Sequence, residues 1–274
     1  MNAPSPAFAD ANAPVLVRQD AGSISVVTLN RPAGRNSLSD ALIAALDAEL
    51  TRLAEDRAIR AVVLAANGPA FCAGHDLKEL TARRADPDGG RAFYHHIMQA
   101  CSAMMQKIVR LPQPIIAAVH ATATAAGCQL VASCDLAVAS EAAKFATPGV
   151  NIGLFCSTPM VALSRNVPRK RAMEMLLTGE LVSADDALQW GLVNRVVPAG
   201  RERDEALALA ATIAAKSSHV VKIGKEAFYR QLEMSLADAY QYAADVMLEN
   251  MMARDAEEGI GAFVEKRTPK WEDR

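Results

Sequence analysis

Apolar residues recur along the first half of the chain with two periods. Short apolar runs typical of strands occupy residues 23–29, 61–66, 114–119 and 135–140, and the second of these is apolar enough to be buried on both faces of a sheet. Between the runs, apolar residues at spacings of three and four indicate two helices, one containing Leu42, Leu46, Leu50 and Leu53, the other Phe93, Ile97, Cys101, Met104 and Ile108. This alternation predicts an α/β fold of repeated strand, loop and helix units.

Helices dominate beyond Thr147. Ser183 and Ser235 each stand three residues before an Asp and directly before a segment whose apolar residues have helical spacing. This pattern is typical of a residue that caps the start of a helix. Residues 193–197 form the one late strand candidate. We therefore expect a disordered lead-in at residues 1–14, an α/β core at 15–200, and a helical docking or oligomerisation region at 201–274 within the same assembly.

Residues 111–134 contain no Asp, Glu, Lys or Arg, which raises the question of a membrane span. Two prolines at the start and several polar residues favour a buried strand, a turn and a buried helix start instead. Within this stretch, the sequence AAGCQL places small residues at 125–127 directly before the neutral amide of Gln129. Such a turn permits a close backbone approach.

Charge and cysteine content limit the partners and the compartment. The net charge is −2 and the cations are scattered, so nucleic acid is not expected as a partner. Five cysteines without a CxxC pair fit a reducing compartment, and the first fourteen residues resemble neither a secretory signal nor a transit segment. We expect a cytoplasmic protein without membrane contact.

Two loops rich in small residues follow predicted strands. FCAGHD begins at Phe71, and ATATAAGC begins at Ala121. Ligands bind beyond the carboxyl ends of parallel strands, and each loop can direct a backbone N–H at the same oxygen. Two such donors make an oxyanion hole, in which one donor is worth about 3 kcal/mol of transition-state stabilisation.

Several motifs resemble, in order and spacing, the enoyl-CoA hydratase/isomerase or crotonase family, and the resemblance covers nearly the whole chain. They are NRPAGRNSLS, AFCAGHDLKEL, AAGCQL running into VASCDLAVAS, AKFATPGVNIGL and RKRAMEMLLTGELVSADDALQWGLVNRVV. The resemblance implies a spiral of ββα units with a C-terminal helical trimerisation region, trimers that pair into hexamers, and acyl-CoA thioester substrates. It implies no permanently bound cofactor, coenzyme A being part of the substrate, and no metal.

Carried over by position, the family's two oxyanion-hole N–H groups fall on His75 and Ala126. Hydratases of this family have glutamates where this chain has Gln129 and Gly149, so it resembles a branch that lacks both. Gln129 cannot exchange a proton near neutral pH, and Gly149 has no side chain. Because a positioned acid or base contributes about 10² to 10⁴ in rate, we expect hydratase activity to be weak or absent.

Other groups near these loops remain alternatives. Ser157 stands where a related dehalogenase branch has its nucleophile, although a helix cap explains it more simply. Three cysteines flank the proposed site, and burial in the core is the simpler interpretation for each: Cys72, Cys128 and Cys156. Asp76 is either a further catalytic carboxylate or the cap of the helix that begins with DLKEL.

Coenzyme A carries phosphates and an adenine, which need cations and an apolar surface. Candidate contacts are Arg35, Ala73, His75, Asp76, Leu77, Lys78, Phe263 and Lys266, with a neighbouring subunit as one source of Phe263. Three classes of function stay open: an enzyme that works by polarisation alone, such as a decarboxylase or thioesterase, a non-catalytic acyl-CoA binding or scaffold protein, and a structural oligomer.

Overall fold

A computed structural model describes residues 13–274, so most of the predicted lead-in at 1–14 lies outside the described residues. Its central sheet has six strands in the order β1-β2-β3-β4-β6-β9, with only β1 antiparallel to its neighbour. The strands are β1 Leu16–Ala21, β2 Ile24–Leu29, β3 Ala61–Ala66, β4 Ile115–Val119, β6 Leu136–Ser140 and β9 Arg195–Val197. The parallel order brings the loops after β3 and β4 to one edge.

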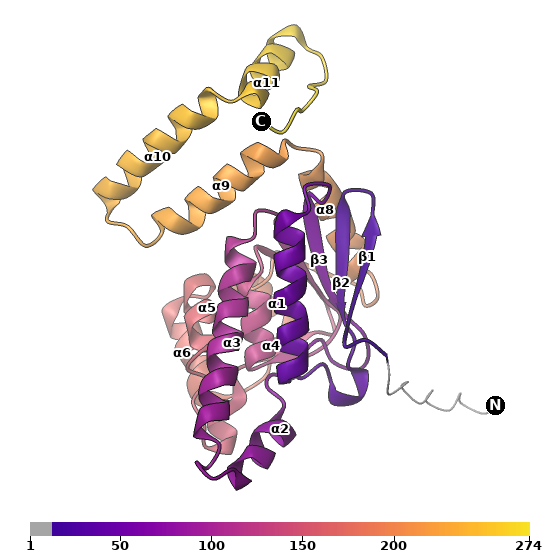
Figure 1. Cartoon of the computed structure of the whole chain (residues 1–274), viewed down its shortest axis with the longest axis vertical. Coiled ribbons are helices and arrows are strands. Elements are labelled where there is room, and N and C mark those ends of the chain that lie inside the picture. The colour runs from indigo at the N-terminus through magenta and orange to yellow at the C-terminus, as the bar shows by residue number, and fades with distance from the viewer. Residues whose placement is uncertain (1–12) are drawn as a thin grey trace, which may run out of the picture.

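One face of the sheet is covered by α1 (Asp40–Glu55), α3 (Arg91–Arg110) and α4 (Ala126–Ser133) (Figure 1). Ser39 caps α1 by accepting a hydrogen bond from the N–H of Leu42. Alternate residues of β3 divide between two cores: Val62 and Leu64 pack under these helices, and the residues between them face the other side. The predicted burial of this strand on both faces is therefore confirmed.

The second face is covered by α8 (Glu202–Ala214). Its Ala206, Ala210 and Ala214 repeat at intervals of four and pack against β2, β3, β4 and β6. Alanine at this spacing lets the helix lie close to the strands. This helix, the first of the predicted C-terminal region, thus belongs to the same core as the sheet.

A smaller sheet, in the order β5-β7-β8, extends from the end of β4. It consists of β5 Ala123–Thr124, β7 Lys144–Ala146 and β8 Val182–Ser183. The shorter helices of the chain are α2 Leu77–Ala82, α5 Pro159–Asn166, α6 Arg169–Thr178 and α7 Ala184–Gln189, with 3-10 turns at Pro32–Gly34, Arg83–Ala85 and Pro148–Ile152. The predicted helix start at Ser183 is confirmed, since its hydroxyl accepts a hydrogen bond from the N–H of Asp186.

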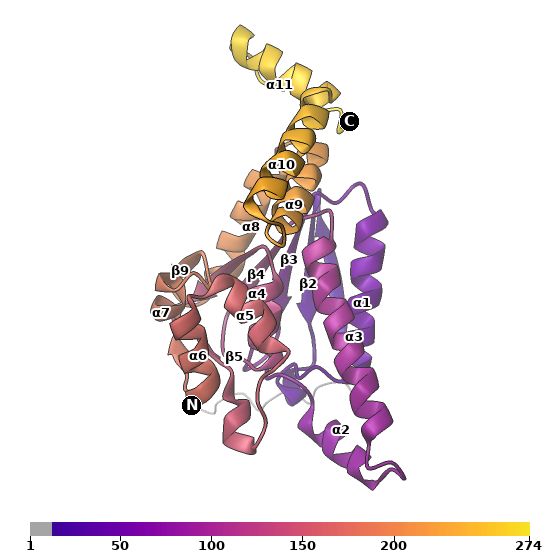
Figure 2. The ribbon, with the colours of Figure 1, turned by 90° about the vertical axis from the view of Figure 1, so that its left-hand side faces the viewer.

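Three helices extend away from the sheet as an arm: α9 (Ser218–Gln231), α10 (Leu236–Met251) and α11 (Arg254–Glu265). Figures 1 and 2 both place this arm at the opposite end of the molecule from α2. A buried contact joins α9 to the core, where Lys225 Nζ lies 2.7 Å from Asp135 Oδ2 and Tyr229 donates to Asp135 Oδ1 at 3.0 Å. The arm is thus anchored at its base.

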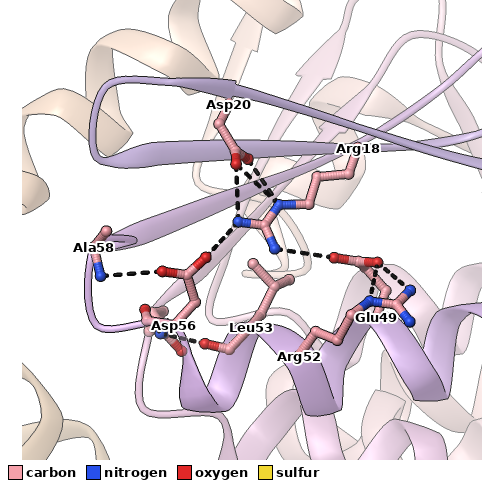
Figure 3. Close-up of polar contacts among 8 residues, drawn as sticks. Arg18, Asp20, Glu49, Arg52, Leu53, Asp56 and Ala58 are labelled. Atoms are coloured by element: carbon pink, nitrogen blue, oxygen red, sulfur yellow. Dashed lines mark hydrogen bonds and ion pairs between the residues drawn. The ribbon is translucent and has the colours of Figure 1, made fainter.

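The edge strand β1 is held by ion pairs around Arg18 (Figure 3). Its guanidinium contacts Asp20 on the same strand at 2.8 Å, Asp56 at the end of α1 at 2.6 Å and the buried Glu49 at 3.3 Å. Glu49 also pairs with Arg52. The hydrogen bonds from Arg18 hold the pKa of Asp20 below its usual value, against the opposing effect of burial.

In residues 13–274 no single helix is long and apolar enough to span a membrane. Together α8 and α9 meet that criterion by length and composition, but they are bent by 106° to each other. The uncharged stretch at 111–134 forms the predicted buried strand, β4, and the predicted buried helix start, α4, with the short strand β5 in place of a simple turn.

Candidate functional site

The loops after β3 and β4 are fixed side by side by backbone hydrogen bonds. The N–H of Phe71 donates to Thr122 O at 3.0 Å, and the N–H of Thr124 donates to Cys72 O at 2.9 Å. An added Cβ on Gly127 would lie 2.1 Å from Cys72 O, so only glycine permits this approach. Gly74 also lies near the second loop, because an added Cβ there would lie 2.9 Å from the Cβ of Ala125 and 3.4 Å from Ala126 N. The two predicted donor positions therefore adjoin each other.

The turn before α4 has an unusual backbone. Ala125 adopts φ 50° and ψ −119°, a conformation that strongly favours glycine, and its N–H donates to Ala146 O at 2.9 Å. Ala126 follows as the first residue of α4. The backbone N–H groups of His75 and Ala126 have no hydrogen-bond acceptor within residues 13–274. Because the N-terminal end of a helix is also electropositive, the two N–H groups are suited to bind an anionic oxygen.

Gln129 lies one turn along α4 and is 5% exposed, and its Oε1 has no partner among the described residues. The amide of Gln129 can hydrogen-bond but cannot move a proton near neutral pH.

Gly149, the second such position, is buried in the turn Pro148–Ile152. A Cβ there would lie 2.9 Å from both Leu154 O and Cys156 Sγ, and the N–H of Gly149 donates to that sulfur at 3.3 Å. Sequence shows that Gly149 has no side chain. The structure adds that a side chain has no room there.

The His75 ring is largely buried, and neither ring nitrogen has a partner among the described residues. Burial lowers the pKa of this imidazole below its ordinary value.

Asp76 caps α2 by accepting from the N–H groups of Lys78 at 3.1 Å and Glu79 at 3.4 Å, and it pairs with Arg31 at 3.1 Å. Burial works against its charge, but Arg31 and the two N–H groups outweigh it and lower the pKa of Asp76. A carboxylate with a low pKa is a weak base near neutral pH, and these contacts match the capping interpretation.

The remaining nucleophile candidates differ in exposure. Burial raises the pKa of the Cys72 and Cys128 thiols to about 12, and burial also raises the pKa of Cys156. These thiols are therefore poor sources of thiolate. Ser157 is exposed and lies one residue before the cap of α5, because Pro159 opens that helix and Thr158 takes the cap position. The prediction of Ser157 as the cap is wrong by one residue.

The candidate coenzyme A contacts separate into two groups. Six lie on one edge, where the N–H of Ala73 donates to Arg35 O at 3.1 Å: Arg35, Ala73, His75, Asp76, Leu77 and Lys78. Arg35, Leu77 and Lys78 are exposed there. Phe263 and Lys266 belong to the end of the arm, at the opposite end of the molecule (Figure 1). Within one chain they do not join the other six.

Sequence reasoning missed Thr147, which is fully buried with an Oγ1 that has no partner among the described residues. It follows β7, whose Ala146 pairs with Thr124 of β5, and so adjoins the turn at Ala125. The available signal was a polar residue directly before Pro148 at the end of a short apolar run.

Residues 19–274 match the enoyl-CoA hydratase/isomerase family. A rat protein named enoyl-CoA hydratase domain-containing protein 3, mitochondrial, is 48% identical over 93% of this chain and 83% of its own length. Two crystal structures are also similar. An enoyl-CoA hydratase of Mycobacterium smegmatis has 54% identity and a TM-score of 0.90 over 94% of this chain and 99% of its own. Human enoyl coenzyme A hydratase domain-containing protein 3 has 46% identity and a TM-score of 0.89 over 94% of this chain and 100% of its own.

These comparisons confirm the predicted crotonase fold, with its central sheet and C-terminal helices. They contradict the prediction of a cytoplasmic protein, because the rat relative and its vertebrate counterparts are named as mitochondrial. That prediction depended on cysteine content and on the first fourteen residues. Reduced cysteines indicate a reducing environment, and such an environment does not identify a single compartment.

Proposed function

Because the chain belongs to the enoyl-CoA hydratase/isomerase family, we propose that it binds an acyl-CoA thioester with the thioester carbonyl between the N–H groups of His75 and Ala126. The observation that carries this proposal is the pair of adjoining backbone donors that have no acceptor among the described residues. The exposed Arg35 and Lys78 lie on the same edge and are suited to the phosphates. The neighbouring subunit of a trimer is the proposed source of Phe263 and Lys266.

The chemistry proposed for this site is polarisation without a resident base. Hydrogen bonds from two N–H groups stabilise the negative charge that develops on the thioester oxygen, which favours enolate formation, decarboxylation or acyl transfer. Gln129 offers no titratable group, and Gly149 is enclosed by Leu154 O and Cys156 Sγ. Hydration of a double bond is therefore proposed to be slow, and a decarboxylase or thioesterase reaction fits the remaining groups better.

The enclosure of Gly149 also supports a second candidate, an acyl-CoA binding protein without turnover. Such a protein has the same two donors and needs no proton-moving group. Measuring free coenzyme A and carbon dioxide released from a panel of acyl-CoA and carboxyacyl-CoA esters separates this candidate from the enzymes.

The primary test combines calorimetric titration of acyl-CoAs of several lengths with an assay of crotonyl-CoA hydration. We expect binding of at least one ester, hydration at least 10²-fold below that of an ordinary hydratase, and a gain of hydration in Gln129→Glu. Gln129→Ala is the matched control without a carboxylate. Hydration at an ordinary rate that is lost in Gln129→Ala would overturn the proposed lack of a base, and failure to bind any ester would overturn the oxyanion hole.

A further inference from the structure

The last residues of the chain fold back to the start of the arm. This segment, the tail (residues 267–274), follows α11 and ends beside the junction of α8 and α9 (Figure 1). The indole Nε1 of Trp271 donates to Ala215 O at 3.0 Å, and Asp273 Oδ1 accepts from the N–H of Ser218 at 2.8 Å. The tail therefore supplies hydrogen bonds that the end of α8 and the start of α9 cannot make within their own helices.

Arg60 connects the tail to the sheet. It directly precedes β3, and its guanidinium donates to Ala214 O at 3.2 Å and to Lys216 O at 3.3 Å. The same guanidinium pairs with Asp273 Oδ2. Because α8 and α9 are bent by 106° to each other, Asp273 links the sheet to the first turn of α9 across this bend.

The tail is also bound to α11. The buried carboxylate of Asp255 accepts from the N–H groups of Glu272 at 2.7 Å and Asp273 at 2.9 Å. Glu258 Oε1 accepts from the N–H of Lys270 at 2.8 Å. Since α9 leaves the bend and α11 leads back to it, the tail joins the two ends of the arm.

The direction of the arm depends on few contacts with the core. In the described part of the chain, α9 and α10 contain no buried residue, and every residue of the tail is at least partly exposed. A second attachment is the pair of Lys225 and Asp135, in the middle of α9. Segments that bury few side chains open at a lower cost in free energy than the core does, so the tail can detach while the sheet stays folded.

We propose that the tail is a detachable strap that sets the angle between the arm and the sheet, with Asp273 as the residue that attaches it to the bend. While the strap is attached, α9 is held at two points and the arm has one direction. Once the strap is released, the arm pivots about the pair of Lys225 and Asp135. Because Phe263 and Lys266 lie at the end of the arm, the strap determines where their side chains reach.

The test measures the distance between two spin labels by pulsed electron paramagnetic resonance. The labels are attached to Ala44→Cys, on the exposed side of α1, and to Ala243→Cys, on the exposed side of α10. The five native cysteines are buried, which disfavours their labelling. We expect a narrow distance distribution in the full chain and one at least about twofold broader in Asp273→Ala and in a chain that ends at Lys266, because the released arm takes several directions.

Arg274→Gln is the matched control, because this side chain is 73% exposed and pairs with Glu272 of the tail itself. It is expected to leave the distribution unchanged. An unchanged distribution in both Asp273→Ala and the shortened chain overturns the proposal. Equal broadening in Arg274→Gln overturns it as well, since loss of any charge in the tail is then sufficient. Circular dichroism of Asp273→Ala is expected to show unchanged helix content, and a loss of helix overturns the proposal because the arm then unfolds instead of pivoting.

Discussion

At the scale of single residues, the site depends on backbone positions that accept only certain side chains. Gly127 admits no Cβ because Cys72 O would lie 2.1 Å from it. Ala125 has a side chain in a conformation, φ 50° and ψ −119°, that glycine adopts far more easily. The turn that directs the Ala126 N–H is therefore held in place against local strain by the bonds around it.

We expect Ala125→Gly to stabilise the fold by about 1 kcal/mol, because relief of about 1 to 3 kcal/mol of strain exceeds the roughly 0.5 to 1 kcal/mol that glycine costs in unfolded-state entropy. Urea unfolding measures the difference in unfolding free energy, and the slope of that free energy against urea concentration should be the same for both proteins. Ala126→Gly, one residue later and inside the helix, is the control and should destabilise by about 0.5 to 1 kcal/mol. Equal stability of the two variants would argue against strain at Ala125.

The sequence was sufficient to predict which residues occupy the site, but not how closely other atoms pack around Gly149. The neutral amide of Gln129 and the missing side chain of Gly149 can be read directly from the chain. The closeness of Leu154 O and Cys156 Sγ to Gly149 depends on how a five-residue turn closes, and no periodic pattern encodes that. Thr147 was missed for a related reason, since its lack of a partner becomes visible only when its neighbours are placed.

At the scale of elements, the strongest local signals were reliable. The predicted capping residues Ser183 and Ser235 each accept a hydrogen bond from a backbone N–H in the first turn of the helix that they open. The strand β1 was missed because LVRQDA is half polar and lies exposed at the sheet edge. The two- and three-residue strands β5, β7 and β8 are too short to show a period, and they form only because tertiary contacts align them.

The end of the arm is held by a buried carboxylate. Asp255, 1% exposed in the first turn of α11, accepts from the N–H groups of Glu272 at 2.7 Å and Asp273 at 2.9 Å. Its own N–H donates to Arg274 O at 3.0 Å. Burial opposes the charge, but hydrogen bonds from Ser217 and the two N–H groups outweigh it and lower the pKa of Asp255. The last residues are thereby folded back onto the helix.

We expect Asp255→Asn to destabilise the chain by about 1 to 2 kcal/mol at pH 7, because hydrogen bonds to a charged acceptor are stronger than those to a neutral amide. A lowered folded-state pKa means that this stability is present above the unfolded pKa of about 3.9 and is lost as the pH falls through the folded value. The difference from wild type should therefore shrink below about pH 4 in urea unfolding.

Asp245→Asn, on the exposed side of α10, is the control and should have little effect at either pH. A difference between Asp255→Asn and wild type that stays constant from pH 7 to pH 3 would contradict the role of the charge.

At the scale of the whole molecule, the proposed site and the end of the arm are far apart. His75 and Ala126 lie at the carboxyl ends of β3 and β4, whereas Phe263 and Lys266 lie beyond α9 and α10 (Figure 2). The resemblance to a family, spread over nearly the whole chain, was sufficient to predict the fold. It was not sufficient to show which candidate contacts one chain brings together, because that depends on the direction in which the arm leaves the sheet.

The arm carries large apolar side chains that its own chain leaves exposed, and association of chains would cover them. Those more than 70% exposed are Leu236, Tyr240, Met252, Phe263 and Val264. We expect the chain to sediment at three or six times its mass of 29.2 kDa. Phe263→Asp should shift the particle to smaller species at unchanged helix content and weaken acyl-CoA binding together with assembly, because a charge in an apolar contact is costly.

Phe263→Leu, which keeps the apolar surface, is the matched variant and should retain both assembly and binding. Sedimentation and calorimetry on the same samples decide whether the two properties are linked. If Phe263→Asp dissociates the assembly and leaves binding unchanged, the arm assembles the chains without contributing to the site. If the wild-type chain sediments at 29.2 kDa across micromolar concentrations, the arm is not an oligomerisation element. The joint loss of assembly and binding is the result expected if each site is completed by the arm of a neighbouring chain.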